Sequence, residues 1–134
     1  MKKQAFINGR VLTPEQDKFE TLNLLLINGI VTGQGYIPDD DDSEVINIAK
    51  HILLPINPDK SDAFKALSDD EKKEALSTTP QEWVVMKRPS FPFNKKASFI
   101  IFSTQNKTAA TLEDASWESL ECKYIIEDGK QITL

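Results

Sequence analysis

Residues 24–31, with the sequence LLLINGIV, place an Asn-Gly pair between two short apolar runs. Two further stretches share this pattern: AFINGRVL at 5–12, with Asn8-Gly9, and YIIEDGKQI at 124–132, with Asp128-Gly129. Type I′ turns require positive φ at both central residues, which Asn, Asp and Gly tolerate best, and their twist matches that of the flanking strands. Each stretch therefore predicts a β-hairpin, and we expect a mainly β chain.

The composition of the 134-residue chain is typical of a globular protein. Hydrophobic residues make up 40% and charged residues 28%, which favours a packed fold over disorder. The length fits a single domain over residues 1–134 and is too short for an α/β barrel with its helices. The net charge of −5 argues against a nucleic-acid partner. Adjacent basic residues at 87–88 and 95–96 are interpreted as solvated strand ends.

The setting of the protein is indicated by its cysteine content and its first residues. One cysteine, Cys122, excludes an internal disulfide and favours an intracellular protein. Residues 1–9 reach a polar turn before the apolar core of a signal peptide can form. No apolar run approaches the roughly 20 residues that a membrane helix requires. We therefore expect a cytoplasmic protein with no membrane partner.

The N-terminal segment, residues 1–55, is expected to form strands and tight turns. Its apolar run at 22–27 is interrupted only by Asn23, which predicts the most buried strand of the chain, covered on both faces. The stretch at 44–49 alternates enough to predict another strand. Residues 51–55 form a short apolar run that ends at a proline.

Residues 56–81 predict a short helical link. Ser68 and Glu71 have the spacing of a capping box, which marks the start of a helix. Phe64 and Leu67 lie three residues apart, at helical spacing. Because the apolar faces of these helices are small, we expect the link to lie on the surface between two β segments.

The C-terminal segment, residues 82–134, returns to β patterns. Strands are predicted at 83–86 and 97–102, the second of them buried, with a proline-broken loop at 90–94 between them. A final hairpin is predicted from about residue 122 to the end of the chain. The stretch at 111–120 stays open between a helical turn and irregular structure.

The sequence offers no set of residues typical of a metal site or a nucleophilic enzyme. A zinc site needs several convergent ligands, whereas the chain has one histidine, His51, and one cysteine, Cys122. A Cys122/His51 dyad would depend on folding that the sequence does not reveal, and His51 is interpreted as structural. The acidic run at 39–42, with Glu44, lacks the alternating ligands of a calcium loop and is interpreted as a solvated turn.

Two further motifs are interpreted as structural. The Gly33-Gln34-Gly35 stretch is too short for a dinucleotide-binding fingerprint and is interpreted as a loop. Six aromatic residues lack interleaved basic residues and are interpreted as core: Trp83, Phe91, Phe93, Phe99, Phe102 and Trp117. The sequence thus predicts no catalytic, cofactor-binding or metal-binding residue, and no cofactor.

Motifs at both ends of the chain occur in the order found in one enzyme family. At the N-terminus they are the two Asn-Gly pairs leading to Gly33, then EVIN at 44–47 and LLP at 53–55; at the C-terminus they are KASFIIF at 96–102 and the hairpin at 123–132. This order resembles the amidohydrolase superfamily, above all its dihydroorotase and hydantoinase branch, over about residues 4–55 and 84–134. In that family both segments form a composite β-sandwich beside a metal-dependent barrel, so the resemblance implies such a sandwich here.

The resemblance stops where the barrel of that family begins. The family continues from a Pro-Gly pair into a His-x-His metal motif, whereas this chain continues as PINPDK at 55–60. The metal-binding histidines, bridging lysine and catalytic aspartate have no counterparts, so the resemblance implies a domain that is not an enzyme. The sandwich face that packs on the barrel in that family must here be polar, be covered by residues 61–81 or bind a partner.

Three functional hypotheses follow from the sequence. The first is a non-catalytic binding or assembly module that forms a homodimer or joins an amidohydrolase-type partner subunit. The second is a small ligand-binding protein or enzyme with a new pocket between the sandwich and the helical link, which requires a deep apolar concavity with convergent polar groups. The third is an evolutionary remnant or engineered barrel deletion with only structural meaning.

Overall fold

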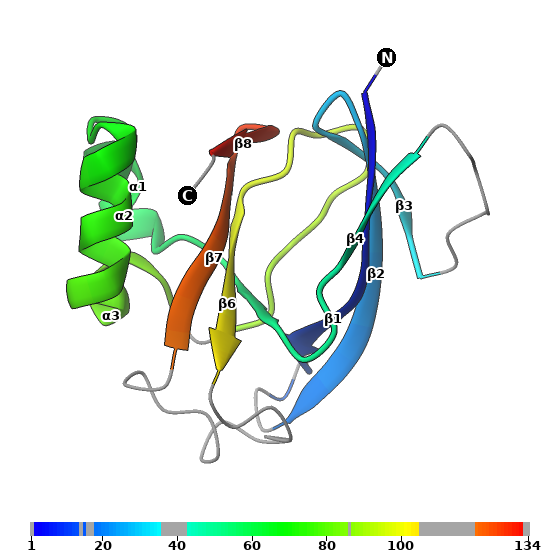
Figure 1. The fold of residues 1–134 in the computed structure, drawn as a ribbon, viewed down its shortest axis with the longest axis horizontal. Helices are drawn as coiled ribbons and strands as arrows, with labels where there is room; N and C mark the ends of the chain where they lie inside the picture. Colours follow the sequence, from blue (N-terminus) through cyan, green and yellow to red (C-terminus); the bar gives the residue numbers. More distant parts are fainter. Residues whose placement is uncertain are drawn as a thin grey trace.

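The computed structural model describes residues 2–13, 15, 18–35, 43–85, 87–104 and 120–132. Within these ranges the chain is mainly β, and its strands form one mixed sheet (Figure 1). The strands are β1 (Lys3–Leu12), β2 (Phe19–Ile27), β3 (Ile30–Gln34), β4 (Ser43–Asn47), β5 (Ile52–Leu54), β6 (Phe99–Thr104), β7 (Leu120–Glu127) and β8 (Lys130–Ile132). The helices are η1 (Pro58–Lys60), α1 (Ser61–Lys65), α2 (Asp69–Thr78) and α3 (Pro80–Trp83).

The N- and C-terminal segments contribute to the same sheet, as the sequence predicts. The strand order is β3-β2-β1-β5-β6-β7-β8, and β4 pairs with β1 beside β5. The segments join where β5 pairs antiparallel with β6, with Ile52 opposite Phe102 and Leu54 opposite Ile100. The helices lie between β5 and β6 in the sequence, but the two strands pair directly with each other. A sheet built from both chain segments, with a helical link between them, is therefore confirmed.

The Asn28-Gly29 and Asp128-Gly129 turns are hairpin turns, as predicted, and they meet in space. All four residues have positive φ, between 50° and 80°, and the pairs connect β2 to β3 and β7 to β8. Ala97 joins the two turns, since its N–H donates to the Gly29 carbonyl at 3.0 Å and its carbonyl accepts from the Gly129 N–H at 2.8 Å. The two chain segments are therefore tied together at this end as well.

The third predicted hairpin, on Asn8-Gly9, is wrong. Both residues lie inside β1, where the pairing with β2 shifts register between Phe6 and Gly9. Asn8 has a φ of 64°, and its N–H donates to the Asn23 side chain at 2.8 Å instead of to the strand ladder. A residue that tolerates positive φ serves a β-bulge as well as a turn, and here it bends a continuous strand.

Two apolar clusters lie on opposite faces of the central strands. The inner cluster lies on the face of the sheet that points away from the helices. It includes Phe6, Leu24, Leu26, Val31, Ile48, Leu53, Phe91, Phe99, Ile101 and Ile126. The helix-side cluster lies between the sheet and the helices and consists of Leu12, Ile52, Leu54, Phe64, Leu76, Val84, Ile100, Phe102 and Ile125. Residues from strands at both ends of the sheet share the inner cluster, which makes the architecture sandwich-like.

The most buried strands are β5 and β6, and the prediction for residues 22–27 is wrong in this respect. In β2, buried Leu22, Leu24 and Leu26 alternate with half-buried residues, so only one face is covered. Every residue of β5 is buried, and so are residues 99–102, whose strand is predicted correctly as buried. These central strands are covered twice because the inner cluster lies on one face and the helix-side cluster on the other.

The helical link covers one face of the sheet, and Figure 1 shows it beside β7. The capping box is confirmed, because the Glu71 N–H donates to Ser68 Oγ at 3.2 Å and the Ser68 N–H donates to the Glu71 carboxylate at 2.9 Å. Phe64 and Leu76 are fully buried in the helix-side cluster. Residues of the helical link thus cover the helix-side face of the sheet.

The other strands and turns predicted from the sequence are confirmed in some parts of the chain and wrong in others. The strand expected at 44–49 is β4, residues 52–54 form β5, and the final hairpin is β7–β8. The strand predicted at 83–86 is wrong, because Trp83 ends α3 and Val84 forms only an isolated bridge with Ile56. Residues 111–119, with Trp117, lie outside the described residues. In the part of the chain that the structure describes, no helix is long and apolar enough to cross a membrane.

Candidate functional site

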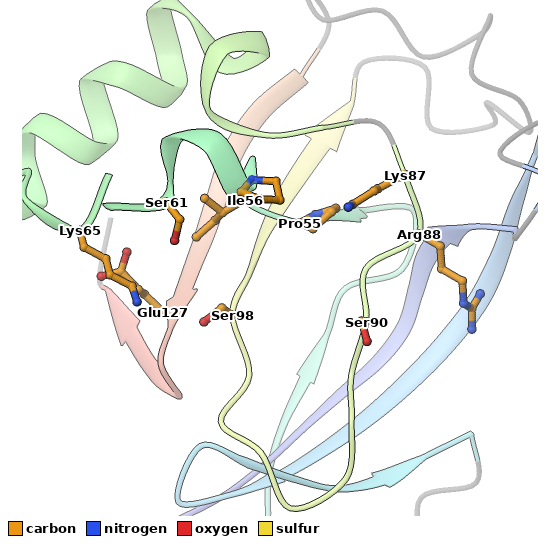
Figure 2. Close-up of a pocket in the computed structure, with 10 residues that line it drawn as sticks. Pro55, Ile56, Ser61, Lys65, Lys87, Arg88, Ser90, Ser98 and Glu127 are labelled. Carbon is orange, nitrogen blue, oxygen red and sulfur yellow. The ribbon is translucent and has the colours of Figure 1, made fainter. Parts of the chain in front are cut away.

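A cleft of about 550 Å³ lies between the sheet and the helical link (Figure 2). Its lining combines three apolar residues with hydroxyl and charged side chains: Pro55, Ile56, Pro58, Ser61, Lys65, Lys87, Arg88, Ser90, Ser98 and Glu127. The volume lies in the range of about 300–1,000 Å³ that is common for small-molecule sites. This is the place where the second sequence hypothesis requires a pocket, although the cleft is half open to solvent instead of deep.

Two antiparallel chain segments form the stem of the helical link and one wall of the cleft. The chain leaving β5 and the chain returning from α3 pair through a bridge between Ile56 and Val84. The Asn57 N–H donates to the Trp83 carbonyl at 2.8 Å, which extends this pairing by one residue. Pro58 then starts η1 at a position where a helix does not use the missing N–H. This stem fixes the link relative to the sheet.

A buried ion pair anchors the link to the sheet at one end of the cleft. Lys72 of α2 and Glu127 of β7 are 2.7 Å apart, and their side chains are only 6% and 13% exposed. The Lys72 ammonium also lies 5.3 Å from the centre of the Phe64 ring. The second carboxylate oxygen of Glu127 is buried and has no hydrogen-bond partner among the described residues. Loss of Lys72 would thus leave a buried charge without compensation.

The basic side chains of the lining differ in what they already bind. Lys65 lies 3.6 Å from Asp128 in an exposed ion pair. Arg88 pairs with Glu20 and donates to the Leu12 carbonyl, and Figure 2 shows it pointing away from the centre of the cleft. The Lys87 side chain points across toward Pro55 in the same view. Lys87 makes no side-chain ion pair within the described ranges.

Ser98 presents a hydroxyl with a defined orientation. It precedes β6, and its Oγ accepts a hydrogen bond from the Asp128 N–H at 3.0 Å. Since a backbone N–H already occupies one lone pair of this oxygen, the hydroxyl hydrogen remains available for an acceptor in the cleft. Ser61 and Ser90 add two further hydroxyl groups to the lining.

The structure does not join the two residues of the dyad considered from the sequence. His51 lies between β4 and β5, and its Nδ1 is 3.0 Å from the Ala49 carbonyl oxygen. Cys122 lies on β7 and packs against the helix-side cluster. Burial raises the pKa of its thiol to about 12, with a smaller contribution from the Glu121 carboxylate. The thiolate that nucleophilic catalysis requires is therefore disfavoured.

The other sequence candidates fall outside the cleft. The acidic run at 39–42 lies outside the described residues, and Glu44 is exposed on β4. The loop interpretation of residues 33–35 is wrong for Gly33 and Gln34, which belong to β3. Among the aromatic candidates, Phe91, Phe99 and Phe102 are core residues as predicted, whereas Phe93 is 57% exposed. Across the described ranges, no three His, Cys, Asp or Glu residues are grouped to hold a metal ion.

The residues of the cleft have no motif that sequence analysis could find. Lys87 and Arg88 are predicted as solvated strand ends, but they lie in an irregular segment beside the cleft, and Arg88 is half-buried in an ion pair. The only available signals were two prolines at 55 and 58 and the basic pair at 87–88. These positions are about 30 residues apart, and only the stem of the link brings them together.

No family model matches this chain, and no curated protein matches it at a significant level. The resemblance to the amidohydrolase superfamily therefore stays a prediction from the sequence.

Proposed function

We propose that this chain is a non-catalytic binding module and that the cleft between the sheet and the helical link is its binding site. The observation that carries the proposal is the cleft itself, because the stem, residues 87–90 and the sheet all contribute to its lining. Its volume suits a small molecule, and polar groups converge on it from separate elements. These features support the ligand-binding hypothesis more directly than assembly through an open sheet face, since the helices cover that face.

Nuclear magnetic resonance of the isotopically labelled full chain tests this proposal. A set of small fragments of differing charge is screened, and we expect the binders to shift backbone signals of cleft residues such as Ser61, Lys87 and Ser98. A Ser90→Trp variant places a large side chain at the exposed edge of the cleft and is expected to abolish those shifts. Ser77→Trp changes an exposed serine outside the cleft and serves as the matched control. If no fragment shifts cleft signals, the proposal is wrong.

The chemical state of Cys122 supports a binding role over nucleophilic catalysis. Because burial raises the pKa of its thiol to about 12, we expect alkylation by iodoacetamide to be slow at pH 8 and to accelerate up to the most alkaline pH at which the fold persists. The unfolded chain in urea should react much faster at the same pH. A rate for the folded protein that is already maximal near pH 7 would indicate an activated thiol and contradict the non-catalytic assignment.

The ancestry of the sheet is a second part of the proposal. We infer a composite sandwich of amidohydrolase type, because two distant segments build one sheet and a short link replaces the chain between them. Metal analysis of the purified protein is expected to find no stoichiometric zinc. Light scattering and a pull-down with an amidohydrolase-type subunit test the homodimer and the partner subunit. A monomer that captures no such subunit would contradict the assembly role and leave the cleft proposal in place.

A cytoplasmic location is also proposed. It is supported by the single cysteine of the sequence. Fractionation of the source cell tests it, with recovery in the membrane or secreted fraction as the contradicting result.

A further inference from the structure

The charge of the cleft differs in sign from that of the chain. The protein carries a formal net charge of −5, yet three cationic residues and one anionic residue line the cleft. The anionic one, Glu127, is neutralised by Lys72 at 2.7 Å. Positive charge on a concave surface in an otherwise acidic protein raises the local concentration of anions.

The cationic side chains of the lining differ in how firmly they are already held. Arg88 is occupied by Glu20 and the Leu12 carbonyl, whereas the Lys87 ammonium has no partner among the contacts of the described residues. Lys65 contributes a second ammonium, held only by an ion pair with Asp128 in which both side chains are about half exposed. Such an exposed pair contributes little free energy and can be exchanged for a bound anion.

The hydroxyl group of Ser98 lies apart from Lys87, on the Glu127 side of the cleft (Figure 2). Its oxygen already accepts the Asp128 N–H at 3.0 Å, so the remaining hydrogen favours an acceptor such as a carboxylate or phosphate oxygen. Hydrogen bonds in which one partner is charged are shorter and stronger than neutral ones. The opposite wall, formed by Pro55, Ile56 and Pro58, is apolar and suits a ring or a short hydrocarbon body.

We infer that the ligand of this cleft is a small organic anion, with its carboxylate or phosphate at Lys87 and its apolar body against Pro55, Ile56 and Pro58. This inference rests on the proposed function and adds the chemical class of the ligand. The Lys65 ammonium completes the basic lining at the far end. The ion pair between Lys72 and Glu127 keeps the carboxylate of Glu127 from repelling the bound anion.

The inference is tested with three probes of similar size: phenyl phosphate, benzoate and the neutral benzyl alcohol. Binding to the full chain is followed by chemical-shift titration at low and high salt. We expect both anions to shift cleft signals, with affinity that falls as salt rises, and the neutral probe to bind at least about tenfold more weakly. Inorganic phosphate, which lacks an apolar body, should bind more weakly than phenyl phosphate.

Matched lysine variants locate the anion. Lys87→Gln is expected to weaken binding of phenyl phosphate about tenfold. Lys73→Gln removes the same charge from α2 outside this cleft and should leave the affinity unchanged. Each variant is first checked for an unchanged fold by its spectrum, and Ser90→Trp provides a second means of blocking the cleft without removing charge.

The outcomes separate this inference from the proposed function. If benzyl alcohol binds in the cleft as tightly as the anions, or if Lys87→Gln has no effect, the anion inference is wrong and the binding module remains. If the anions shift signals only elsewhere and Lys73→Gln weakens them equally, binding is nonspecific surface attraction and the inference is again overturned. If neither these probes nor the fragment set reaches the cleft, both proposals fail.

Discussion

The Asn28-Gly29 turn and the Asn8-Gly9 bulge have the same dipeptide and different structures. At Asn28-Gly29 both residues have positive φ, 52° and 80°, and the chain reverses direction. At Asn8-Gly9 only Asn8 has positive φ, and the strand continues for three more residues. The difference shows that the dipeptide determines a local backbone shape, while the surrounding pairing determines whether that shape becomes a turn or a bulge.

The two glycines are also required for different reasons. Gly29 faces the other hairpin turn, and a Cβ built on it would lie 2.4 Å from the Gly129 carbonyl oxygen. Gly9 faces the core, where a Cβ would lie 2.7 Å from Leu53 Cδ1 and 2.8 Å from Ile48 Cδ1. The backbone of the Gly129 turn is held by its hydrogen bond to Ala97 and cannot move away. The ends of the Leu53 and Ile48 side chains can. The comparison therefore predicts a clear order of mutational cost.

The largest effect is expected for Gly29→Ala. The new side chain adds strain at a φ of 80° and a collision with the backbone of the second turn, so we expect a loss of about 3 kcal/mol or more in the free energy of unfolding. Chemical denaturation measures it. The control is Gly35→Ala, where φ is 85° but no atom lies within 4 Å, and which should cost about 1 kcal/mol. Equal losses would show that the two turns do not meet.

An intermediate effect is expected for Gly9→Ala, because Leu53 and Ile48 must shift to admit the methyl group. Overpacking of this kind costs about 2 kcal/mol, measured by the same denaturation. Adding Ile48→Val removes one of the two colliding methyl groups and should recover part of the loss, so the two changes are coupled. Strictly additive losses would contradict the predicted contact.

The smallest effects are expected at Asn8. Asn8→Ala leaves the backbone at positive φ but replaces asparagine with alanine, which tolerates this conformation less well. We expect a loss of about 1 kcal/mol in the free energy of unfolding. Asn8→Gly removes that strain and should change stability by no more than about 0.5 kcal/mol. The melting temperatures of the two variants measure the difference. Equal melting temperatures for the two variants would contradict the positive φ at Asn8.

The elements predicted correctly are those that local sequence determines. The capping box at Ser68 and Glu71 and the two true hairpin turns each depend on interactions within a few residues. The buried strand at 99–102 is marked by its continuous apolar run. The bulge at Asn8 was mistaken for a turn because the strand that pairs with it lies beyond the local window. The strand predicted at 83–86 failed because Trp83 completes a helical turn after Pro80.

The cleft could not be predicted in its details, although its general place could. The sequence indicated a helical link and two sheet segments, and a pocket between them was one of its hypotheses. Its lining depends on the stem that joins Ile56 to Val84, and on the ion pair between Lys72 and Glu127, which are 55 residues apart. Neither contact produces a periodic pattern, and single lysines or serines are common on protein surfaces.

The most direct test of the account is a crystal structure of the full chain grown with phenyl phosphate. We predict that the ligand occupies the cleft, with its phosphate within hydrogen-bond distance of Lys87 Nζ and its ring against Pro55 and Ile56. A ligand bound elsewhere, or a cleft that stays empty at a concentration that saturates binding in solution, would contradict the central claim that this cleft is the binding site.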